Sequence, residues 1–295
     1  MWFIILFCAC RESNKAEIND TINSGQITIS IEECFKPVFL EQIKVFQSQN
    51  PQSNIHVLFK SEIDCLKDLF NDSIRMVVVS RNLNDKEFQS LKRKIRFSPR
   101  SDIVAYSAIA VIIPKNQKDS FLSYSEILHY VDGQKNIPVF VDQANASATN
   151  RFLRDSILHQ RPFGKNVKAA LSNANILQLV CSEQPSIGFI GYNWINDFVY
   201  NQEQKDYLKK LQFAAIECID CNGELKDTYT IPTPQSISGG YYPLRMPIYF
   251  ILKENHAGLG SGFINFLSSE SGQLIFKKSV LLPAKINFNK RFVKL

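Results

Sequence analysis

Small hydroxyl residues and an arginine follow an apolar run near the middle of the chain. Residues 137–141 read as a short strand, and apolar residues then recur at helical spacing, which predicts a strand-to-helix turn over residues 142–151. The free N–H groups at the start of a helix can bind an anion. The hydroxyls of Ser147 and Thr149 and the guanidinium of Arg151 would add donors. The turn is therefore either a socket for a tetrahedral oxyanion or an ordinary helix cap.

The composition is that of an ordinary globular protein. The chain has 295 residues, 45% of them hydrophobic and 21% charged, and this length suits one large domain or two lobes. The formal net charge of +6 is mild and fits an anionic small ligand. No block of like charges indicates a nucleic-acid partner.

The first residues resemble the end of a bacterial lipoprotein signal peptide. Residues 2–9 are uncharged and apolar, too few to span a bilayer, and the chain turns polar directly after Cys10. No Lys or Arg precedes the run, a departure that a start codon assigned too late would explain. We expect residues 1–10 to be a signal segment, Cys10 to carry lipid and residues 11–24 to form a tether. The alternative is an apolar terminal strand or tail.

The cysteines and histidines do not predict a metal or cofactor site. Cys218 and Cys221 have the CxxC spacing, but they follow an apparent strand, whereas a redox CxxC normally begins a helix. A local disulfide or two free thiols are both compatible with this position. A lone CxxC is weak evidence for zinc, and the histidines are scattered without metal-ligand spacing.

The first third of the chain alternates strands with helices. Residues 27–31, 55–59 and 76–79 are predicted strands, each followed by a helical pattern, which is typical of an open parallel sheet. Such sheets bind ligands at the carboxyl ends of their strands. The residue pairs at those ends are Cys34-Phe35, Ser61-Glu62 and Ser80-Arg81.

The remaining chain predicts a second lobe. Residues 103–113 form an apolar stretch longer than one typical strand, and we interpret it as two strands in series that cross between lobes. Predicted helices follow near residues 125–130, 149–160, 165–172 and 174–182, with a glycine-punctuated strand over 186–191.

Catalysis is not indicated. Glu32 and Glu33 are adjacent on a predicted strand and would face opposite ways, so they could not act together on one substrate. No set of nucleophile, base and orienting residue is visible. We expect no enzyme activity.

Six segments are distinctive in combination: Ser147-Ala148-Thr149 and residues 79–83, 187–191, 240–245, 263–267 and 272–273. Together they resemble the periplasmic phosphate-binding proteins of phosphate ABC transporters, in which a Ser-Gly-Thr loop binds phosphate, and the resemblance covers most of residues 25–285. It implies a two-lobed α/β fold of the type II periplasmic binding protein arrangement, with two crossing strands as a hinge. Lobe one would comprise residues 25–107 and 246–295, and lobe two residues 108–245.

The resemblance also implies a phosphate site between the lobes. Its expected residues are Cys34, Phe35, Ser61, Glu62, Ser80, Arg81, Asn145, Ser147, Ala148, Thr149 and Arg151. Gln143 stands where the family often has an arginine, so Arg151 or Arg81 would supply the cation, and Ala148 replaces the loop glycine. Glu62, or else Asp142, would accept the proton of hydrogen phosphate.

The implied partners are inorganic phosphate, an ABC transporter permease and, through a lipid at Cys10, a bacterial membrane. The expected location is the periplasmic or cell-surface side of that membrane. Two alternatives remain open at this point. The ligand is another oxyanion, such as sulfate or molybdate, or the protein is a lipoprotein that senses phosphate without transporting it.

Overall fold

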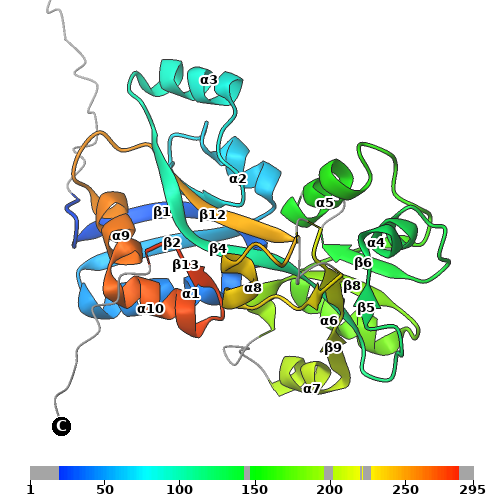
Figure 1. Ribbon diagram of the computed structural model, residues 1–295. Helices are drawn as coiled ribbons and strands as arrows, with labels where there is room; N and C mark the ends of the chain where they lie inside the picture. Colours follow the sequence, from blue (N-terminus) through cyan, green and yellow to red (C-terminus); the bar gives the residue numbers. More distant parts are fainter. Residues whose placement is uncertain (1–19, 143–146, 196–201, 220, 222–226, 286–295) are drawn as a thin grey trace, which may run out of the picture.

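The fold is an α/β arrangement in which helices flank one long mixed sheet (Figure 1). The computed structural model describes residues 20–142, 147–195, 202–219, 221 and 227–285. Within these residues the strand order is β2-β1-β3-β12-β4-β8-β6-β7. Parallel strands sit towards both ends of the sheet, and the antiparallel strands β12 and β4 lie in its middle.

We refer to the first half of the sheet, with the helices that flank it, as lobe one. Its strands are β1 (Gly25–Glu32), β2 (Ser53–Lys60), β3 (Ile74–Val79) and β12 (Arg245–Leu252). Its helices are α1 (Lys36–Gln49), α2 (Glu62–Asp68), α3 (Asp85–Ile95), α9 (Leu259–Ser268) and α10 (Glu270–Lys278). A short 3-10 helix, η1 (Glu33–Phe35), joins β1 to α1. The three predicted parallel strands are confirmed.

We refer to the second half of the sheet, with its helical segments, as lobe two. Its strands are β6 (Val139–Asp142), β7 (Val167–Ala170), β8 (Ile187–Gly191) and β9 (Leu211–Phe213). Its helical segments are α4 (Tyr124–Val131), α5 (Ala148–Phe152), η2 (Leu153–Ile157), α6 (Asn173–Ser182), η3 (Tyr192–Trp194) and α7 (Gln202–Lys210). A separate small sheet contains β5 (Phe121–Leu122), β10 (Ala215–Glu217) and β11 (Tyr229–Thr230). The elements α8 (Pro234–Ser238) and β13 (Leu282–Pro283) lie beside β4.

One strand, β4 (Arg100–Pro114), links the two halves (Figure 1). Its first part pairs with β12, and its second part pairs with β8 and β9. The long apolar stretch is thus one continuous strand rather than two in series. The strand stays continuous because it has strand partners along its whole length. Its residues from Ala108 onward are buried, which suits their apolar side chains.

The prediction of a helix over residues 165–172 is wrong. Val167–Ala170 is strand β7, which pairs in parallel with β6, Val139 opposite Val167. Tertiary pairing with a neighbouring strand overrides the weak helical preference of a short segment. Helix α7 was not predicted, because its apolar residues, Tyr207 and Leu208, are adjacent and do not recur at helical spacing, although both pack against the core.

Two helices of lobe one begin at side-chain caps. The Ser61 hydroxyl accepts a hydrogen bond from the backbone N–H of Asp64 at the start of α2. Asn84 begins α3 in a reciprocal capping box with Glu87. Among the described residues, no helix is both long enough and apolar enough to cross a bilayer.

Candidate functional site

The carboxyl ends of the three parallel strands of lobe one meet, as their polar residues predict. The N–H of Ser80, after β3, donates to Glu32 Oε2, at the end of β1, over 3.0 Å. The Ser80 hydroxyl donates to Glu62 Oε2, after β2, over 3.2 Å. Since β1 lies between β2 and β3, these contacts join neighbouring strand ends at one edge of the sheet.

Glu32 lies at the centre of this cluster and connects the two lobes. While Oε2 accepts from lobe one, Oε1 accepts the backbone N–H of Ala148, at the start of α5 in lobe two, over 3.2 Å. The Cys34 thiol is also hydrogen-bonded to this carboxyl, and burial followed by the charge of Glu32 raises the pKa of that thiol, which keeps its proton. Glu32 is only 2% exposed. The predicted site residues Cys34, Ser80 and Ala148 thus all meet one carboxyl group.

Glu62 is held between two arginines, one from each lobe. Arg151 Nε lies 2.9 Å from Glu62 Oε1 and 3.0 Å from Oε2, and Arg151 Nη2 donates to the Ser80 hydroxyl over 3.3 Å. Arg81 Nε lies 3.1 Å from Glu62 Oε1. Arg81 also makes a two-pronged contact with Glu87, at 2.7 and 2.8 Å. Both predicted cations are therefore brought to the site, and both are paired with carboxylates.

Asp142 holds the start of α5 through hydrogen bonds to its carboxylate. Its Oδ1 accepts from the Ser147 hydroxyl over 2.7 Å, and its Oδ2 accepts from Asn173 Nδ2 over 3.2 Å. The Ser147 hydroxyl also accepts from Asn150 N–H, so it caps α5. Asn173 Nδ2 donates to Glu33 Oε2 over 2.6 Å, which forms another contact between the lobes.

Thr149 differs from Ser147, because its hydroxyl is not engaged in a cap. The residue is 1% exposed, and its Oγ1 has no hydrogen-bond partner of good geometry among the described residues. Its interaction with the Asp142 carboxyl opposes the rise in the pKa of that group that burial causes. A ligand oxygen would offer this buried hydroxyl a better-aligned acceptor.

The remaining predicted residues either lie beside the cluster or fall outside the described part of the chain. Phe35 is fully buried in the core beside Cys34. The Ser61 hydroxyl is occupied by Asp64, its partner in the cap of α2. Asn145 falls outside the described residues, as do Cys10 and Gln143.

The site carries more buried carboxyl groups than the sequence suggested. Burial, with the charges of Glu62 and Asp142, raises the pKa of Glu32 from 4.5 to about 8. Burial also raises the pKa of Glu33 and of Asp142. A carboxyl that keeps its proton near neutral pH costs less to bury and can donate a hydrogen bond. The site is therefore suited to a ligand that shares protons with these groups.

Sequence reasoning missed Glu32, Glu33 and Asn173. The alternation argument fails because β1 ends at Glu32, and Glu33 begins the 3-10 helix η1, so the two side chains do not obey strand geometry. Both are drawn into the contact between the lobes. Their signal was present in the sequence, since two adjacent acidic residues at the carboxyl end of a buried strand are expensive to bury without a purpose.

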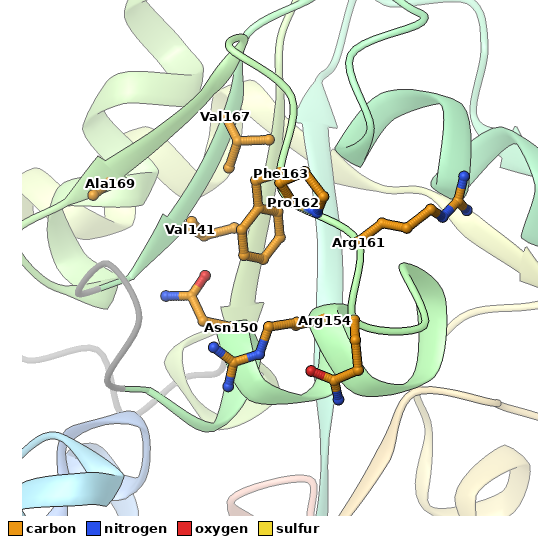
Figure 2. Close-up of a pocket in the computed structure, with 9 residues that line it drawn as sticks. Val141, Asn150, Arg154, Arg161, Pro162, Phe163, Val167 and Ala169 are labelled. Atoms are coloured by element: carbon orange, nitrogen blue, oxygen red, sulfur yellow. The ribbon is translucent and has the colours of Figure 1, made fainter.

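A pocket of about 490 Å³ lies in lobe two, beside α5 and η2 (Figure 2). Asn150 and Arg154 lie along one side, and Val141, Phe163 and Val167 lie opposite. Its lining contains none of the predicted phosphate residues. The pocket is thus separate from the cluster around Glu32.

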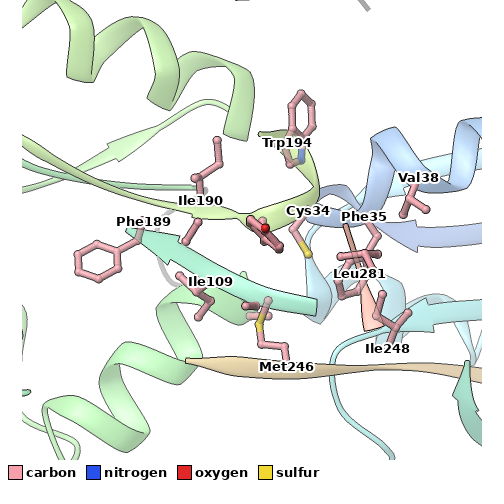
Figure 3. Close-up of a cluster of buried hydrophobic side chains, with 14 of the residues drawn as sticks. Cys34, Phe35, Val38, Ile109, Phe189, Ile190, Trp194, Met246, Ile248 and Leu281 are labelled. Carbon is pink, nitrogen blue, oxygen red and sulfur yellow. The ribbon is translucent and has the colours of Figure 1, made fainter. Parts of the chain in front are cut away.

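The lobes share an apolar core beneath the cluster (Figure 3). Trp194 of η3 lies next to Cys34 and Phe35 of η1. Asn193 Nδ2 donates to the carbonyl oxygen of Cys34 over 2.7 Å. A Cβ at Gly191 would lie 2.9 Å from that oxygen, so only glycine allows this approach. These contacts fix η1, and with it Glu32, against lobe two.

A cluster of ionisable side chains in lobe one contains Asp20, Glu254 and His256. Burial acts to raise the pKa of Asp20, but hydrogen bonds from Arg75, the Leu259 N–H and His256 outweigh it and lower the pKa below its usual range. Protein donors thus occupy the oxygens that a cation would need. The cluster ties Asp20, within the predicted tether, to the start of α9.

Cys218 and Cys221 form a disulfide, with Cα atoms 5.5 Å apart, at the end of β10. The structure therefore selects the first of the two states left open by the sequence. Cys34, Cys65 and Cys181 are free thiols.

The fold and the inter-lobe cluster define a periplasmic-binding-protein-like chain. The family model described as the PBP superfamily domain matches residues 19–271, and the protein belongs to this family. No curated protein sequence matches the chain. The resemblance noted in the sequence is confirmed at this level.

Solved structures with the same fold include phosphate-binding proteins. A candidate phosphate ABC transporter substrate-binding protein from Clostridium perfringens, solved with bound phosphate, is 20% identical; the match covers 88% of this chain and 100% of that one, with a TM-score of 0.70. An ABC-type phosphate transport receptor from Vibrio cholerae is 16% identical over 87% of this chain and 99% of that one, with a TM-score of 0.64.

The same fold also serves other purposes. The reduced form of the regulatory domain of OxyR2 from Vibrio vulnificus is 11% identical, with 84% of this chain and 95% of that one covered and a TM-score of 0.55. At such identities the likeness establishes the fold, and the ligand must be argued from this chain's own residues.

Proposed function

We propose that this protein binds inorganic phosphate between its lobes and delivers it to the permease of an ABC transporter. The observation that carries the proposal is the convergence of Ser80 N–H and Ala148 N–H, one from each lobe, on a single carboxyl group. Donors that meet from two lobes bind an oxyanion most strongly when the lobes close on it.

Each residue would have a distinct role. The N–H groups of Ser80 and Ala148 and the hydroxyl of Thr149 would donate to phosphate oxygens. Arg151 and Arg81 would balance its charge, and Glu62, which lies between them, would accept a phosphate proton. An acceptor at this place favours protonated phosphate over sulfate, which has no proton to share at neutral pH.

The lobe assignment follows the same proposal. Lobe one would comprise residues 25–107 and 246–295, and lobe two residues 108–245, with β4 and the start of β12 as the crossing strands. The main inter-lobe polar contacts, Glu32 with Ala148 and Glu62 with Arg151, then join the two sides of a closed cleft.

Binding is better supported than catalysis. The CxxC pair is a disulfide, and the Cys34 thiol is buried with a raised pKa, so neither supplies a thiolate nucleophile. The apolar run that ends at Cys10 supports a lipid anchor and a position outside the cytoplasm. Mass spectrometry of membrane-extracted protein would reveal lipid on Cys10, and an intact unmodified Met1 in a soluble fraction would refute the anchor.

Anion-dependent thermal unfolding tests the proposed ligand. We expect phosphate to raise the melting temperature, with sulfate and molybdate much less effective and chloride at equal ionic strength as the control. Isothermal titration then gives the affinity. A larger shift with sulfate or molybdate would reassign the ligand, and no shift with any of these oxyanions would overturn oxyanion binding. A permease gene and an ATPase gene beside this one would favour transport over sensing.

A further inference from the structure

We propose that Glu32 is a built-in competitor of the ligand, whose carboxyl group occupies the oxyanion position until the oxyanion displaces it. The inference rests on the proposed function, because it assumes that the donors around Glu32 serve an oxyanion. It adds a specificity-determining residue that the resemblance to phosphate-binding proteins did not supply. The ligand must replace a group of the protein as well as fit the site.

The contacts of Glu32 are those expected of the ligand. Its Oε2 accepts the Ser80 N–H over 3.0 Å and its Oε1 accepts the Ala148 N–H over 3.2 Å. The Cys34 thiol forms a further hydrogen bond to the same carboxyl. The resemblance to phosphate-binding proteins, together with the strand ends, predicted each of these residues as a phosphate contact. The two oxygens of the carboxyl group also resemble one edge of a tetrahedral oxyanion in shape.

The surroundings show that the arrangement is not a simple structural salt bridge. The nearby arginines Arg81 and Arg151 pair with Glu62, whereas Glu32 accepts hydrogen bonds from backbone N–H groups and a thiol. Next to Ala148, the Thr149 hydroxyl is buried and interacts with the Asp142 carboxyl rather than with Glu32. A tetrahedral ion has more oxygens than the Glu32 carboxyl to offer this hydroxyl.

Glu32 links the lobes through its own carboxyl group, and the competition with the oxyanion follows from this link. The carboxyl accepts hydrogen bonds from both lobes, because the Ser80 N–H belongs to lobe one and the Ala148 N–H to lobe two. An oxyanion of low affinity could not displace it. The apparent affinity for the ligand is therefore the intrinsic affinity multiplied by the fraction of molecules in which Glu32 does not occupy the donors.

Substitution of Glu32 distinguishes a competitor from a ligand-holding residue. Glu32→Ala frees both N–H groups, and Glu32→Gln frees one, since its amide nitrogen cannot accept. Phosphate binding by isothermal titration at one pH should become about tenfold tighter or more in the alanine variant, and tighter by a smaller factor in the glutamine variant. Glu33→Gln is the matched control, because it removes a neighbouring acidic charge while its remaining oxygen can still accept from Asn173.

The outcomes separate the two proposals. If the parent binds phosphate and both Glu32 variants bind it more weakly, Glu32 holds the ligand and the competitor proposal is wrong, while phosphate binding stands. If Glu33→Gln tightens binding as much as Glu32→Gln, general charge repulsion replaces specific competition. If neither the parent nor any folded variant binds phosphate, sulfate or molybdate, both proposals fail. Binding by Glu32→Ala alone would support the competitor most strongly.

Discussion

The ion pair between Arg151 and Glu62 joins the two lobes, and its strength can be measured directly. Arg151 contacts both oxygens of Glu62, at 2.9 and 3.0 Å, and donates to the Ser80 hydroxyl. Glu62 is 2% exposed, whereas the Arg151 side chain is 31% exposed. The pair therefore lies between a surface pair, worth about 0–1 kcal/mol, and a buried one, whose disruption costs about 3–5 kcal/mol.

Arg151→Ala should lower the free energy of unfolding by about 2 kcal/mol. The loss is smaller than for a fully buried pair because Arg81 stays 3.1 Å from Glu62 and continues to neutralise it. A double-mutant cycle with Glu62→Gln should give a coupling energy of about 1–2 kcal/mol, measured by urea unfolding without ligand.

Arg154→Ala is the control for this cycle. Arg154 lies on the same helical segment, but its nearest described carboxylate, on Asp155, is 3.7 Å away and its side chain is 40% exposed. Its removal should change stability by less than about 0.5 kcal/mol. A coupling energy below about 0.3 kcal/mol between Arg151 and Glu62 would refute the inter-lobe ion pair.

Further variants test the remaining parts of the site. Thr149→Ala should weaken phosphate binding about ten- to a hundredfold, because it removes a hydrogen bond to a charged group, while Ser123→Ala, which removes the cap of α4, should leave the affinity unchanged. Between pH 4.5 and about 8, Glu32 holds a proton in the folded protein that the unfolded chain releases, so the free energy of unfolding should fall as pH rises through this range. The fall should be smaller in Glu32→Gln, and parallel pH profiles of the parent and the variant would contradict this. Replacing Cys218 and Cys221 by serine should cost no more than about 2 kcal/mol in a thermal or urea melt and should leave binding within a few-fold, and loss of binding by the folded variant would show that the pair belongs to the site.

The sequence determined the framework on which the site is built. The alternating and fully apolar runs predicted β1, β2 and β3, and helix caps such as Ser61 and Asn84 marked where the next helices begin. These features are local, because strand alternation and capping depend on neighbouring residues alone. Once the strands are parallel, their carboxyl ends share one edge of the sheet, and this placed Ser80 and Glu62 at the same edge in advance.

The tertiary structure decided which donors meet and what they meet. The role of Ser147 as a cap, and the surroundings of the Thr149 hydroxyl, depend on where Asp142 and Asn173 lie in three dimensions. The strand β7 likewise forms only because β6 is beside it, although residues 165–172 read as a helix. Short segments take the structure that their long-range partners allow.

Glu32 shows the limit of sequence reasoning most clearly. Strand alternation predicted that the side chains of Glu32 and Glu33 face opposite sides of the sheet. In the structure β1 ends at Glu32, and the 3-10 turn that follows brings both side chains into the inter-lobe contact. The partner of Glu32, the Ala148 N–H, is 116 residues away in the chain. A backbone N–H carries no residue identity, so no pattern of residue types could predict that contact, and only the packing of the two lobes creates it.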